Sequence, residues 1–342
     1  MAGRPIFGRL GYSEETFPFA VRRAFLIYNP ASGQNRERRS DQVLRAAEVL
    51  REAAVEVQTC ATTGAGSAIV QAQQAVEAGF DTIIACGGDG TVNEVLNGVM
   101  AVAGGASPTI GVIPLGSGNL LATDLRLPRK PEAAARALLR YQPRELHPGL
   151  ITYQTKKGER RRYFIIAAGV GADAELMYRT AKGGKERWGI YAYFLEMARM
   201  ALTRDFPMFE VEWLDQEGTR HKDNIALVMA LRAHRFPGLL RRVRLGSALL
   251  RNDYRLMLFR TNRIWRFMSF FFSVATGWNW KISRIDLEYS TWFRCTPIGT
   301  PDAKTKTIHC ETDGESLGRL PVEVAVEQRR FRLLMPEEAA SS

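Results

Sequence analysis

The sequence predicts two domains of different class, an α/β domain with a parallel sheet followed by a largely antiparallel β domain. Three observations support this prediction. The chain has 342 residues, more than the roughly 100 to 200 residues that one core usually holds. Its first 145 residues alternate apolar runs with helical periods. After Leu146, strand-like runs follow one another with short turns between them.

Four apolar runs of the first domain are predicted strands, and each runs into a turn or loop. They are AFLIYNP from Ala24, VEVQTCATTG from Val55, DTIIACGGDG from Asp81 and PTIGVIPLGSGN from Pro108. Helical spacing lies between them, in SDQVLRAAEVLREAA behind a serine cap, in SAIVQAQQAVEAG and in TVNEVLNGVMA. This alternation predicts a parallel sheet covered by helices, with ligand sites beyond the carboxyl ends of the strands.

The second domain begins with a predicted hairpin, LITYQTKKGERRRYFIIAAGVGA from Leu150. Further strand-like runs are FEVEWLD, NIALVMAL, DYRLMLFR, RIDLEYS, TKTIHCETDGE and PVEVAVE. One helix, WGIYAYFLEMARMAL, interrupts them, and its apolar residues on nearly all sides are more typical of a core helix than of a lipid gate. A last strand, FRLLMP from Phe331, could return to the first domain. The predicted domains are therefore 20–146 with about 328–338, and 147–327.

Composition indicates a folded protein of a reducing compartment. Apolar residues make up 46% of the chain, and the four cysteines are scattered singly without a CxxC pair. The N-terminus has no long apolar core typical of a secretory signal. The longest strongly apolar stretch, FMSFFFSVATGW, has about 12 residues and is too short to span a bilayer. We expect a cytoplasmic protein that is at most peripherally associated with a membrane.

The net charge of +11 is concentrated in one segment. Between Asn224 and Arg284 there are twelve Arg and Lys residues against one acid, Asp253. Aromatic side chains are interleaved with these cations, so residues 232–284 are a candidate contact for an anionic membrane surface. One alternative is nucleic acid, which we do not expect because no nucleic-acid module accompanies the segment. Another is a set of solvated arginines on the outer faces of strands.

Three turns rich in small residues follow three of the predicted strands: NPASG at Asn29–Gly33, GGDGT at Gly87–Thr91 and PLGSGN at Pro114–Asn119. The backbone N–H groups of such turns can approach a nucleotide phosphate closely, and a helix N-terminus adds to the attraction. For GGDGT the alternative is a tight strand-to-helix connection with Asp89 or Thr91 as a cap. Three such turns at one sheet edge favour the phosphate site. Neither GxxxxGK[ST] nor GxGxxG after the first strand occurs.

Together with GVGADAE from Gly169 and TDGE from Thr312, these motifs resemble in order and spacing those of the diacylglycerol kinase catalytic-domain family. The family includes soluble bacterial lipid kinases, sphingosine kinases and ceramide kinases, and the resemblance covers about Ala24 to Pro336. It implies a Rossmann-like α/β nucleotide domain of the NAD kinase and diacylglycerol kinase type, a C-terminal antiparallel β-sandwich, and ATP with Mg²⁺ in the cleft between them. The γ-phosphate would pass to a lipid hydroxyl, most simply that of a diacylglycerol-like lipid, with a sphingoid base or ceramide as the alternative.

The resemblance also assigns roles to residues. Asp313 matches the proposed general base of bacterial diacylglycerol kinases, whereas in sphingosine kinases the aspartate at the position of Asp89 has that role. We favour Asp313 as the base and Asp89 as the organiser of metal or phosphate, with Glu315 supporting metal or nucleotide. Asp173 falls where sphingosine kinases place an aspartate near the lipid head group. The residues expected at the nucleotide are Asn29, Ser32, Gly33, Thr63, Gly87, Gly88, Gly90, Thr91, Glu94, Gly116, Ser117, Asn119 and Glu315.

Simpler alternatives exist for two of these carboxylates. Asp313 precedes glycine, and Asp-Gly is a standard turn of β-hairpins. Asp173 could be a loop or cap residue beside the following helix.

The sequence departs from the family pattern at three places. Leu120 follows Asn119, where many bacterial relatives have aspartate. Arg251 and Asn252 stand where Asp-Gly is usual, and the Asp-x-Gly of the domain junction is His147-Pro148-Gly149. Acids near these last places hold a structural Mg²⁺ in some relatives, so the sequence leaves a second metal site open.

Two further functions compete with a lipid kinase. NAD kinases share GGDGT, but the sequence contains no TPTGSTAY-like segment, and PLGSGN favours the lipid branch. A non-catalytic, nucleotide-sensing membrane binder would fit the lost acids, but the retained Asp89, Asp313 and Glu315 argue against it. The expected partners are a lipid substrate and an anionic membrane surface, and a homodimer stays open.

Overall fold

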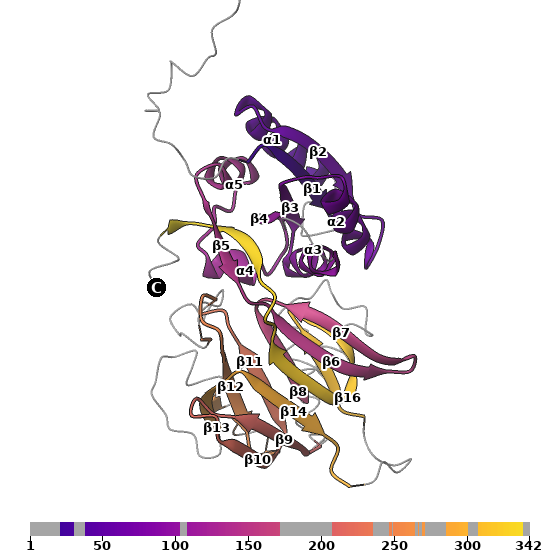
Figure 1. Ribbon diagram of the computed structural model, residues 1–342, viewed down its shortest axis with the longest axis vertical. Helices are drawn as coiled ribbons and strands as arrows, with labels where there is room; N and C mark the ends of the chain where they lie inside the picture. Colours follow the sequence, from indigo (N-terminus) through magenta and orange to yellow (C-terminus); the bar gives the residue numbers. More distant parts are fainter. Residues whose placement is uncertain are drawn as a thin grey trace, which may run out of the picture.

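The computed structural model describes residues 21–30, 38–102, 108–171, 207–234, 246–247, 249–263, 266, 269–270, 285–299 and 307–337. These residues form two domains, stacked along the long axis of the molecule (Figure 1). Ser32, Gly33, Asp173, the predicted helix at 188–202 and most of the basic segment at 232–284 lie outside the described residues.

The first domain is a parallel sheet with helices on both faces. Its sheet has six strands in the order β2-β1-β3-β4-β17-β5, parallel except for β5, which runs antiparallel to β17. The strands are β1 Arg23–Tyr28, β2 Glu56–Ala61, β3 Thr82–Gly87, β4 Thr109–Pro114, β5 Gln142–Leu146 and β17 Phe331–Met335. The helices are α1 Arg39–Glu52, α2 Ser67–Glu77, α3 Asp89–Ala101, α4 Leu120–Asp124 and α5 Pro131–Leu138.

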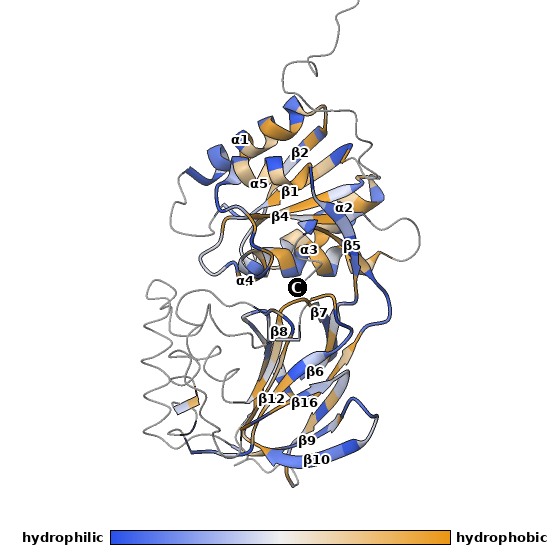
Figure 2. Cartoon of the chain, turned by 90° about the vertical axis from the view of Figure 1, so that its left-hand side faces the viewer, coloured by the Kyte–Doolittle hydropathy of each residue, from blue (hydrophilic) through white to orange (hydrophobic). Residues whose placement is uncertain are grey.

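Alternation of apolar side chains along the strands produces the two covered faces. In β1, Leu26 packs into the core that α1 and α5 close, whereas Phe25 and Ile27 pack into the core beneath α2 and α3. The same division holds in β3, where Ile84 faces α1 and Ile83 faces α3. Figure 2 shows the apolar strands between their helical layers.

The second domain is a single antiparallel sheet of eleven strands. Its main path is β10-β9-β14-β16-β15-β8-β11-β12-β13, and β6 and β7 extend from β16. The strands are β6 Gly149–Thr155, β7 Gly158–Phe164, β8 Ala167–Gly171, β9 Phe209–Leu214, β10 Arg220–Ile225, β11 Leu227–Leu231, β12 Tyr254–Phe259, β13 Ile285–Ser290, β14 Trp292–Thr296, β15 His309–Thr312 and β16 Glu315–Val326.

This sheet curls until its two ends meet. Trp213 Nε1 on β9 donates a hydrogen bond to Glu288 on β13 at 2.7 Å. Arg260, just after β12, pairs with Asp223 on β10 at 2.8 Å and with Asp286 on β13 at 2.7 Å. The enclosed space holds a separate apolar core with Trp213 and Tyr254 among its largest members. The predicted antiparallel β-sandwich thus takes the form of one sheet folded on itself.

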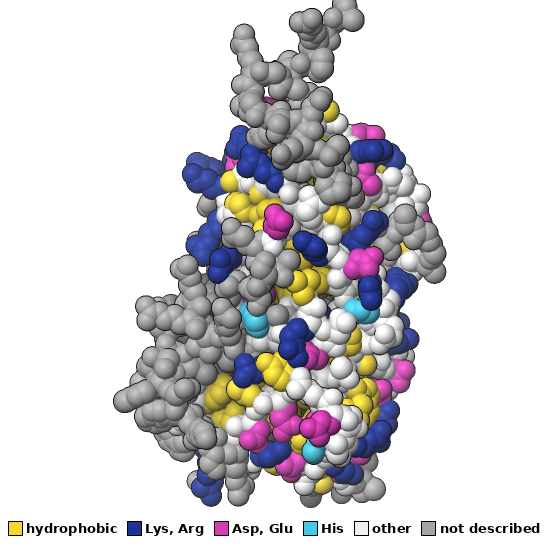
Figure 3. All heavy atoms as spheres, turned by 60° about the vertical axis from the view of Figure 1, so that its left-hand side comes forward, with side chains coloured by type: hydrophobic (Ala, Val, Ile, Leu, Met, Phe, Trp, Pro, Cys, Tyr) yellow, Lys and Arg dark blue, Asp and Glu magenta, His cyan; other side chains and the backbone are white. Residues whose placement is uncertain are grey.

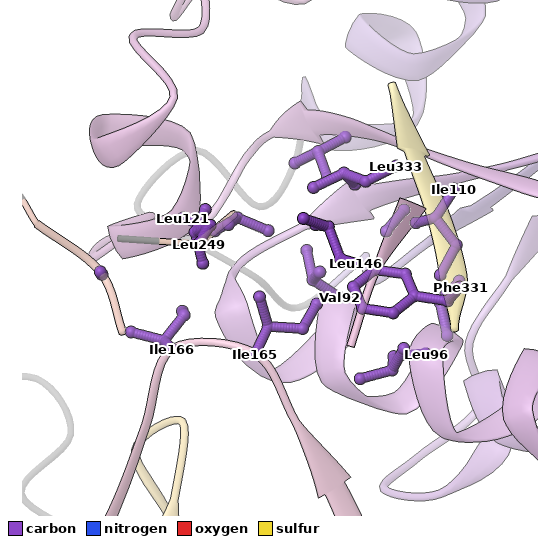
Figure 4. Close-up of a cluster of buried hydrophobic side chains, with 14 of the residues drawn as sticks. Val92, Leu96, Ile110, Leu121, Leu146, Ile165, Ile166, Leu249, Phe331 and Leu333 are labelled. Carbon is purple, nitrogen blue, oxygen red and sulfur yellow. The ribbon is translucent and has the colours of Figure 1, made fainter. Parts of the chain in front are cut away.

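An apolar core joins the two domains. Val92 and Leu96 of α3 belong to the same buried cluster as Ile165 and Ile166, which link β7 to β8 (Figure 4). Phe331 of β17 lies in this cluster too. The contact between the domains is therefore a continuous hydrophobic interior.

The described surface carries charges of both signs, interspersed over the face seen in Figure 3. Several arginines of the basic segment have partners within the fold: Arg232 is buried, Arg251 pairs with Asp253, and Arg255 lies over the ring of Tyr289. Among the described residues no helix has the length and apolarity needed to cross a membrane.

Candidate active site

The two glycine-rich turns of the first domain pack backbone against backbone. Gly87 ends β3 and Gly116 follows β4, and Leu115 N donates to Gly87 O at 2.9 Å. A Cβ added at Gly116 would lie 2.4 Å from Gly88 Cα, so this contact requires glycine. The predicted neighbourhood of GGDGT and PLGSGN at one sheet edge is present in the structure.

Asn119 closes the second turn with its own side chain. Its backbone has φ 49°, its Oδ1 accepts from Gly116 N at 3.0 Å, and its Nδ2 donates to Gly116 O at 2.7 Å. Asparagine tolerates this left-handed conformation better than most residues. Ser117, at the tip, is exposed.

Asp89 lies between the two turns, in the first turn of α3. Its carboxylate accepts hydrogen bonds from Leu120 N at 2.9 Å and Leu121 N at 3.2 Å, at the start of α4. Burial raises the pKa of Asp89, the two N–H groups oppose this shift, and the charge of Asp313 adds to it. Asp89 and Asp313 are thus within electrostatic reach of each other.

The N-terminus of α3 lacks a side-chain cap because its capping residue is Gly88. Thr91 folds back over the preceding turn, and a Cβ added at Gly87 would lie 2.3 Å from Thr91 Oγ1. A helix N-terminus without a cap leaves backbone N–H groups and a positive dipole end for an anion.

Glu94 acts on a neighbouring loop. Its carboxylate accepts from Gly66 N at 2.8 Å and Ala68 N at 3.0 Å, which caps the N-terminus of α2. Thr63, exposed in the loop before that helix, donates its N–H to Ser67 Oγ at 3.1 Å. Glu94 therefore fixes the loop that carries Thr63.

Asp313 comes from the second domain, in the turn between β15 and β16, with φ 49°. Four donors surround its carboxylate. Oδ1 accepts from Ile166 N at 2.8 Å and Ala167 N at 3.0 Å, and Oδ2 accepts from Ile165 N at 3.1 Å and Asn93 Nδ2 at 2.8 Å. Burial raises the pKa of Asp313, while these hydrogen bonds oppose the rise. The turn is more than a hairpin connection, because its aspartate joins the β7–β8 link to α3.

Two residues that the sequence motifs did not single out complete this network. Arg162 on β7 donates from Nε to Asn93 Oδ1 at 2.8 Å and from Nη2 to Glu315 Oε2 at 2.6 Å. Glu315 Oε1 lies against Gly90, where an added Cβ would be 2.7 Å away. Asn93 occurs inside the GGDGTVNEV motif, which could have drawn attention to it. Arg162 lies in a run of three arginines that has no such signal.

The structure therefore gathers most of the predicted residues around the N-terminus of α3. Asn29 follows β1 at the same sheet edge, since Tyr28 is in register with Cys86 of β3. The residues around this point are Asn29, Gly87, Gly88, Asp89, Gly90, Thr91, Gly116, Asn119, Asp313 and Glu315. Thr63, Glu94 and Ser117 lie on adjoining loops and helices.

A buried guanidinium contacts the backbone at His147 and Arg251. Arg232, 1% exposed, donates to the carbonyl oxygens of His147, Leu249 and Arg251. Burial lowers the pKa of Arg232. Within the described residues, three carbonyls from the domain junction and from the loop before β12 thus face a cation that belongs to the chain itself.

Comparison with curated proteins supports a kinase relationship. The chain is 29% identical over 321 residues to a diacylglycerol kinase of Bacillus subtilis, covering 94% of this chain and 98% of that protein. It is 36% identical over 171 residues to a probable lipid kinase YegS-like protein of Chromohalobacter salexigens, covering 50% of this chain and 51% of that protein.

Solved structures show the fold. A diacylglycerol kinase of Bacillus anthracis superposes with a TM-score of 0.64 at 20% identity, over 93% of this chain and 98% of that one. Yeast NADH kinase, complexed with NADH, superposes with a TM-score of 0.53 at 10% identity, over 93% and 84% of the two chains. The predicted fold class is confirmed.

The family model described as the diacylglycerol kinase catalytic domain matches residues 23–151. This range contains β1 to β5, both glycine turns, Asp89 and the start of β6. Residues 23–151 are therefore similar to the diacylglycerol kinase catalytic domain, and nearly the whole chain is similar to a diacylglycerol kinase.

Proposed function

We propose that the chain is an ATP- and Mg²⁺-dependent lipid kinase that transfers the γ-phosphate to the hydroxyl of a diacylglycerol-like lipid. One observation carries the proposal. Asp89 lies between two glycine turns in the first turn of α3, and Asp313, which the second domain supplies, accepts a hydrogen bond from Asn93 one turn further along the same helix. Phosphoryl transfer needs such an arrangement: an anion cradle and a carboxylate beside it for the hydroxyl proton.

The nucleotide phosphates fit the N-terminus of α3. Gly88 caps this helix without a side chain, so the first N–H groups of α3 have no side-chain cap. The N-terminus of α2 differs, because Glu94 already occupies it. Anion binding is therefore expected at α3, with Thr63 and Asn29 on the flanks.

The carboxylates of the site suit a metal ion that arrives with a nucleotide. Among the described residues no group of three or more His, Cys, Asp or Glu could hold a metal alone. Mg²⁺ is commonly held by one or two carboxylates together with phosphate oxygens, and Asp89 and Glu315 would supply these. The ion would neutralise charge on the transferred phosphoryl group.

Asp313 is the proposed base. Its raised pKa makes its carboxylate a stronger proton acceptor for a lipid hydroxyl. Its four donors are the backbone N–H groups of residues 165–167 and the side-chain amide of Asn93. Asp89 has fewer donors, and it remains the alternative base.

Two other kinds of substrate are alternative outcomes of the activity test described below. A sphingoid base or ceramide would suit the GSGN turn, and NAD would suit the fold of the yeast NADH kinase. The lipid must also be reached at a membrane. Contact of residues 232–284 with an anionic membrane is part of the proposal and concerns mainly residues outside the described ranges.

The decisive experiment incubates the purified chain with γ-labelled ATP, Mg²⁺ and, separately, diacylglycerol, sphingosine, ceramide and NAD, the lipids in mixed micelles. We expect label on diacylglycerol. Label on sphingosine or ceramide alone would change the substrate, and label on NAD alone would overturn the lipid kinase. ATP binding without any labelled product would indicate a non-catalytic binder.

Variants test the base in the same assay. Asp313→Asn should lower kcat by at least about a hundredfold, the usual range for a lost general base, and Asp89→Asn should weaken nucleotide use. Asp41→Asn, exposed on α1, is the matched control. If Asp313→Asn stays within a few fold of wild type while Asp89→Asn is inactive, Asp89 is the base.

A further inference from the structure

Arg162 differs from the two arginines that precede it. Arg160 and Arg161 are exposed on β7, whereas the side chain of Arg162 is 18% exposed and reaches across the domain boundary. It contacts Glu315 of its own domain and Asn93 of α3 in the other domain. A cation at this junction is not needed for the hairpin itself, because β6 pairs with β7 through the backbone.

These two contacts link Arg162 to both carboxylates that the second domain contributes, directly to Glu315 and through Asn93 to Asp313. Nη2 holds Glu315 Oε2 at 2.6 Å, and the other oxygen of Glu315 faces Gly90 at the start of α3. Nε holds Asn93 Oδ1 at 2.8 Å, and Asn93 Nδ2 then points to Asp313 Oδ2 at 2.8 Å. An amide group turned the other way would place its oxygen against the carboxylate. Arg162 therefore helps to fix the direction in which Asn93 donates, together with Tyr163 O, which accepts from Asn93 Nδ2 at 3.0 Å, and Asn97 Nδ2, which donates to Asn93 Oδ1 at 3.1 Å.

Its role follows from the planar geometry of the guanidinium. Nε and Nη2 lie in one rigid plane, so a single side chain can hold an amide oxygen and a carboxylate at a set spacing. The site has four acidic residues, Asp89, Glu94, Asp313 and Glu315. Within the described part of the chain, the Arg162–Glu315 pair is the one ion pair that involves any of them. Arg162 thus holds the carboxylate of Glu315.

We propose that Arg162 is a positioning residue for phosphoryl transfer, which holds Glu315 against the start of α3 and, through Asn93, sets the carboxylate of Asp313. This role rests on the proposed kinase function. Arg162 does not touch the reacting atoms in this arrangement. Its loss should therefore lower the rate of the chemical step more than the affinity for either substrate.

The test compares three single variants in the lipid kinase assay. Arg162→Gln removes the charge, Arg162→Lys keeps the charge but cannot hold both partners in one plane, and Arg161→Gln is an exposed neighbour on the same strand. We expect kcat to fall about tenfold to a hundredfold in Arg162→Gln, with KM for ATP and lipid within about threefold. Arg162→Lys should lie between, and Arg161→Gln should match wild type.

A double variant shows whether the effect passes through Glu315. If it does, Arg162→Gln combined with Glu315→Gln should be little slower than Glu315→Gln alone. Three outcomes would each overturn the role. The first is a fall in kcat of the double variant equal to the product of the two single falls. The others are a rise in KM at unchanged kcat, and equal activity of Arg162→Gln and Arg161→Gln.

The same variants in urea unfolding separate this proposal from the kinase function. If Arg162 and Glu315 stabilise each other, the double variant should lose less stability against unfolding than the two single variants lose when their effects are added as free energies. A wild-type protein that labels no lipid contradicts the proposed function, whatever this cycle gives. An active wild type with independent effects of the two substitutions contradicts the role of Arg162.

Discussion

Asp313 is a carboxylate buried among four hydrogen-bond donors, and two opposing effects act on its pKa. Burial disfavours the charged form, and the donors favour it. Burial outweighs the donors, so the pKa of Asp313 in the folded chain lies above the ordinary value of 3.8. The folded state then binds this proton more tightly than the unfolded state. The contribution of Asp313 to stability is present below about pH 3.8 and is lost as pH rises through the raised pKa.

The upward direction of the pKa shift of Asp313 can be tested with the Asp313→Asn variant. The variant places an amide among the same donors and should be less stable by about 1–3 kcal/mol for each donor left unpaired. The difference in unfolding free energy between wild type and variant should shrink as pH rises from about 4, measured by urea unfolding in a series of buffers. A difference that grows with pH would mean that the four donors dominate and that the pKa is lowered.

Single residues also show what the sequence can and cannot reveal. Asp89 and Gly116 could be predicted, because their neighbours in the chain form the turns that place them. Arg162 could not, because its partner Glu315 is 153 positions away and the run of arginines at 160–162 has the composition of a solvated hairpin. Asn93 lies between these cases: its motif marks it, but its direction toward Asp313 depends on the packing of two domains.

Helix α3 meets an edge strand of the second domain through the side chain of Asn97. Among the described strands β7 pairs with β6 alone, so the N–H and C=O groups on its other edge need partners. Asn97 Oδ1 accepts from Tyr163 N at 2.9 Å, and its Nδ2 donates to Tyr163 O at 3.0 Å. One amide side chain thus takes the place of a neighbouring strand.

Asn97→Ala should uncover this edge. We expect a loss of about 1–3 kcal/mol in unfolding free energy, because Tyr163 keeps a partly buried N–H without its partner. Hydrogen exchange of the Tyr163 amide should accelerate as well. Glu48→Ala, on the exposed face of α1, should change stability by less than about 0.5 kcal/mol. Equal stability of the two variants would show that α3 does not support β7 in this way.

At the scale of elements, the first four strands could be predicted because each is an apolar run that ends in a turn or loop. Strand β5 was not predicted, since QPREL has little apolar character and is a strand only because β17 lies beside it. The sequence also could not show that β16 begins at Glu315, or that the pairing of β15 with β16 shifts register between Cys310 and Glu311.

The whole molecule should unfold as one unit, because its domains share an apolar core and the first sheet contains a strand from beyond the second domain. Trp213 and Trp292, the tryptophans among the described residues, lie on β9 and β14, so their fluorescence reports on the second domain. Helices α1 to α5 all belong to the first domain, so the circular dichroism of these helices reports on that domain. We expect the two signals to change together.

Phe331→Ala tests this coupling. Phe331 is 1% exposed in the shared core, and its truncation should cost about 3–5 kcal/mol. Both signals should move to lower urea concentration by the same amount. Leu44→Ala, at a site 47% exposed, should leave them in place. Two separate transitions, with only the helical signal moved by Phe331→Ala, would mean that the domains unfold independently.

The position of β17 between β4 and β5 has a consequence for synthesis on the ribosome. All strands of the second domain, β6 to β16, are translated before β17. Until β17 emerges, β4 has a bare edge and β5 has no neighbour, so the nascent first domain is unfinished. The domain that is made second can therefore complete its sheet before the one that is made first. Chaperones that act on the nascent chain would meet the open edge of β4 throughout this interval.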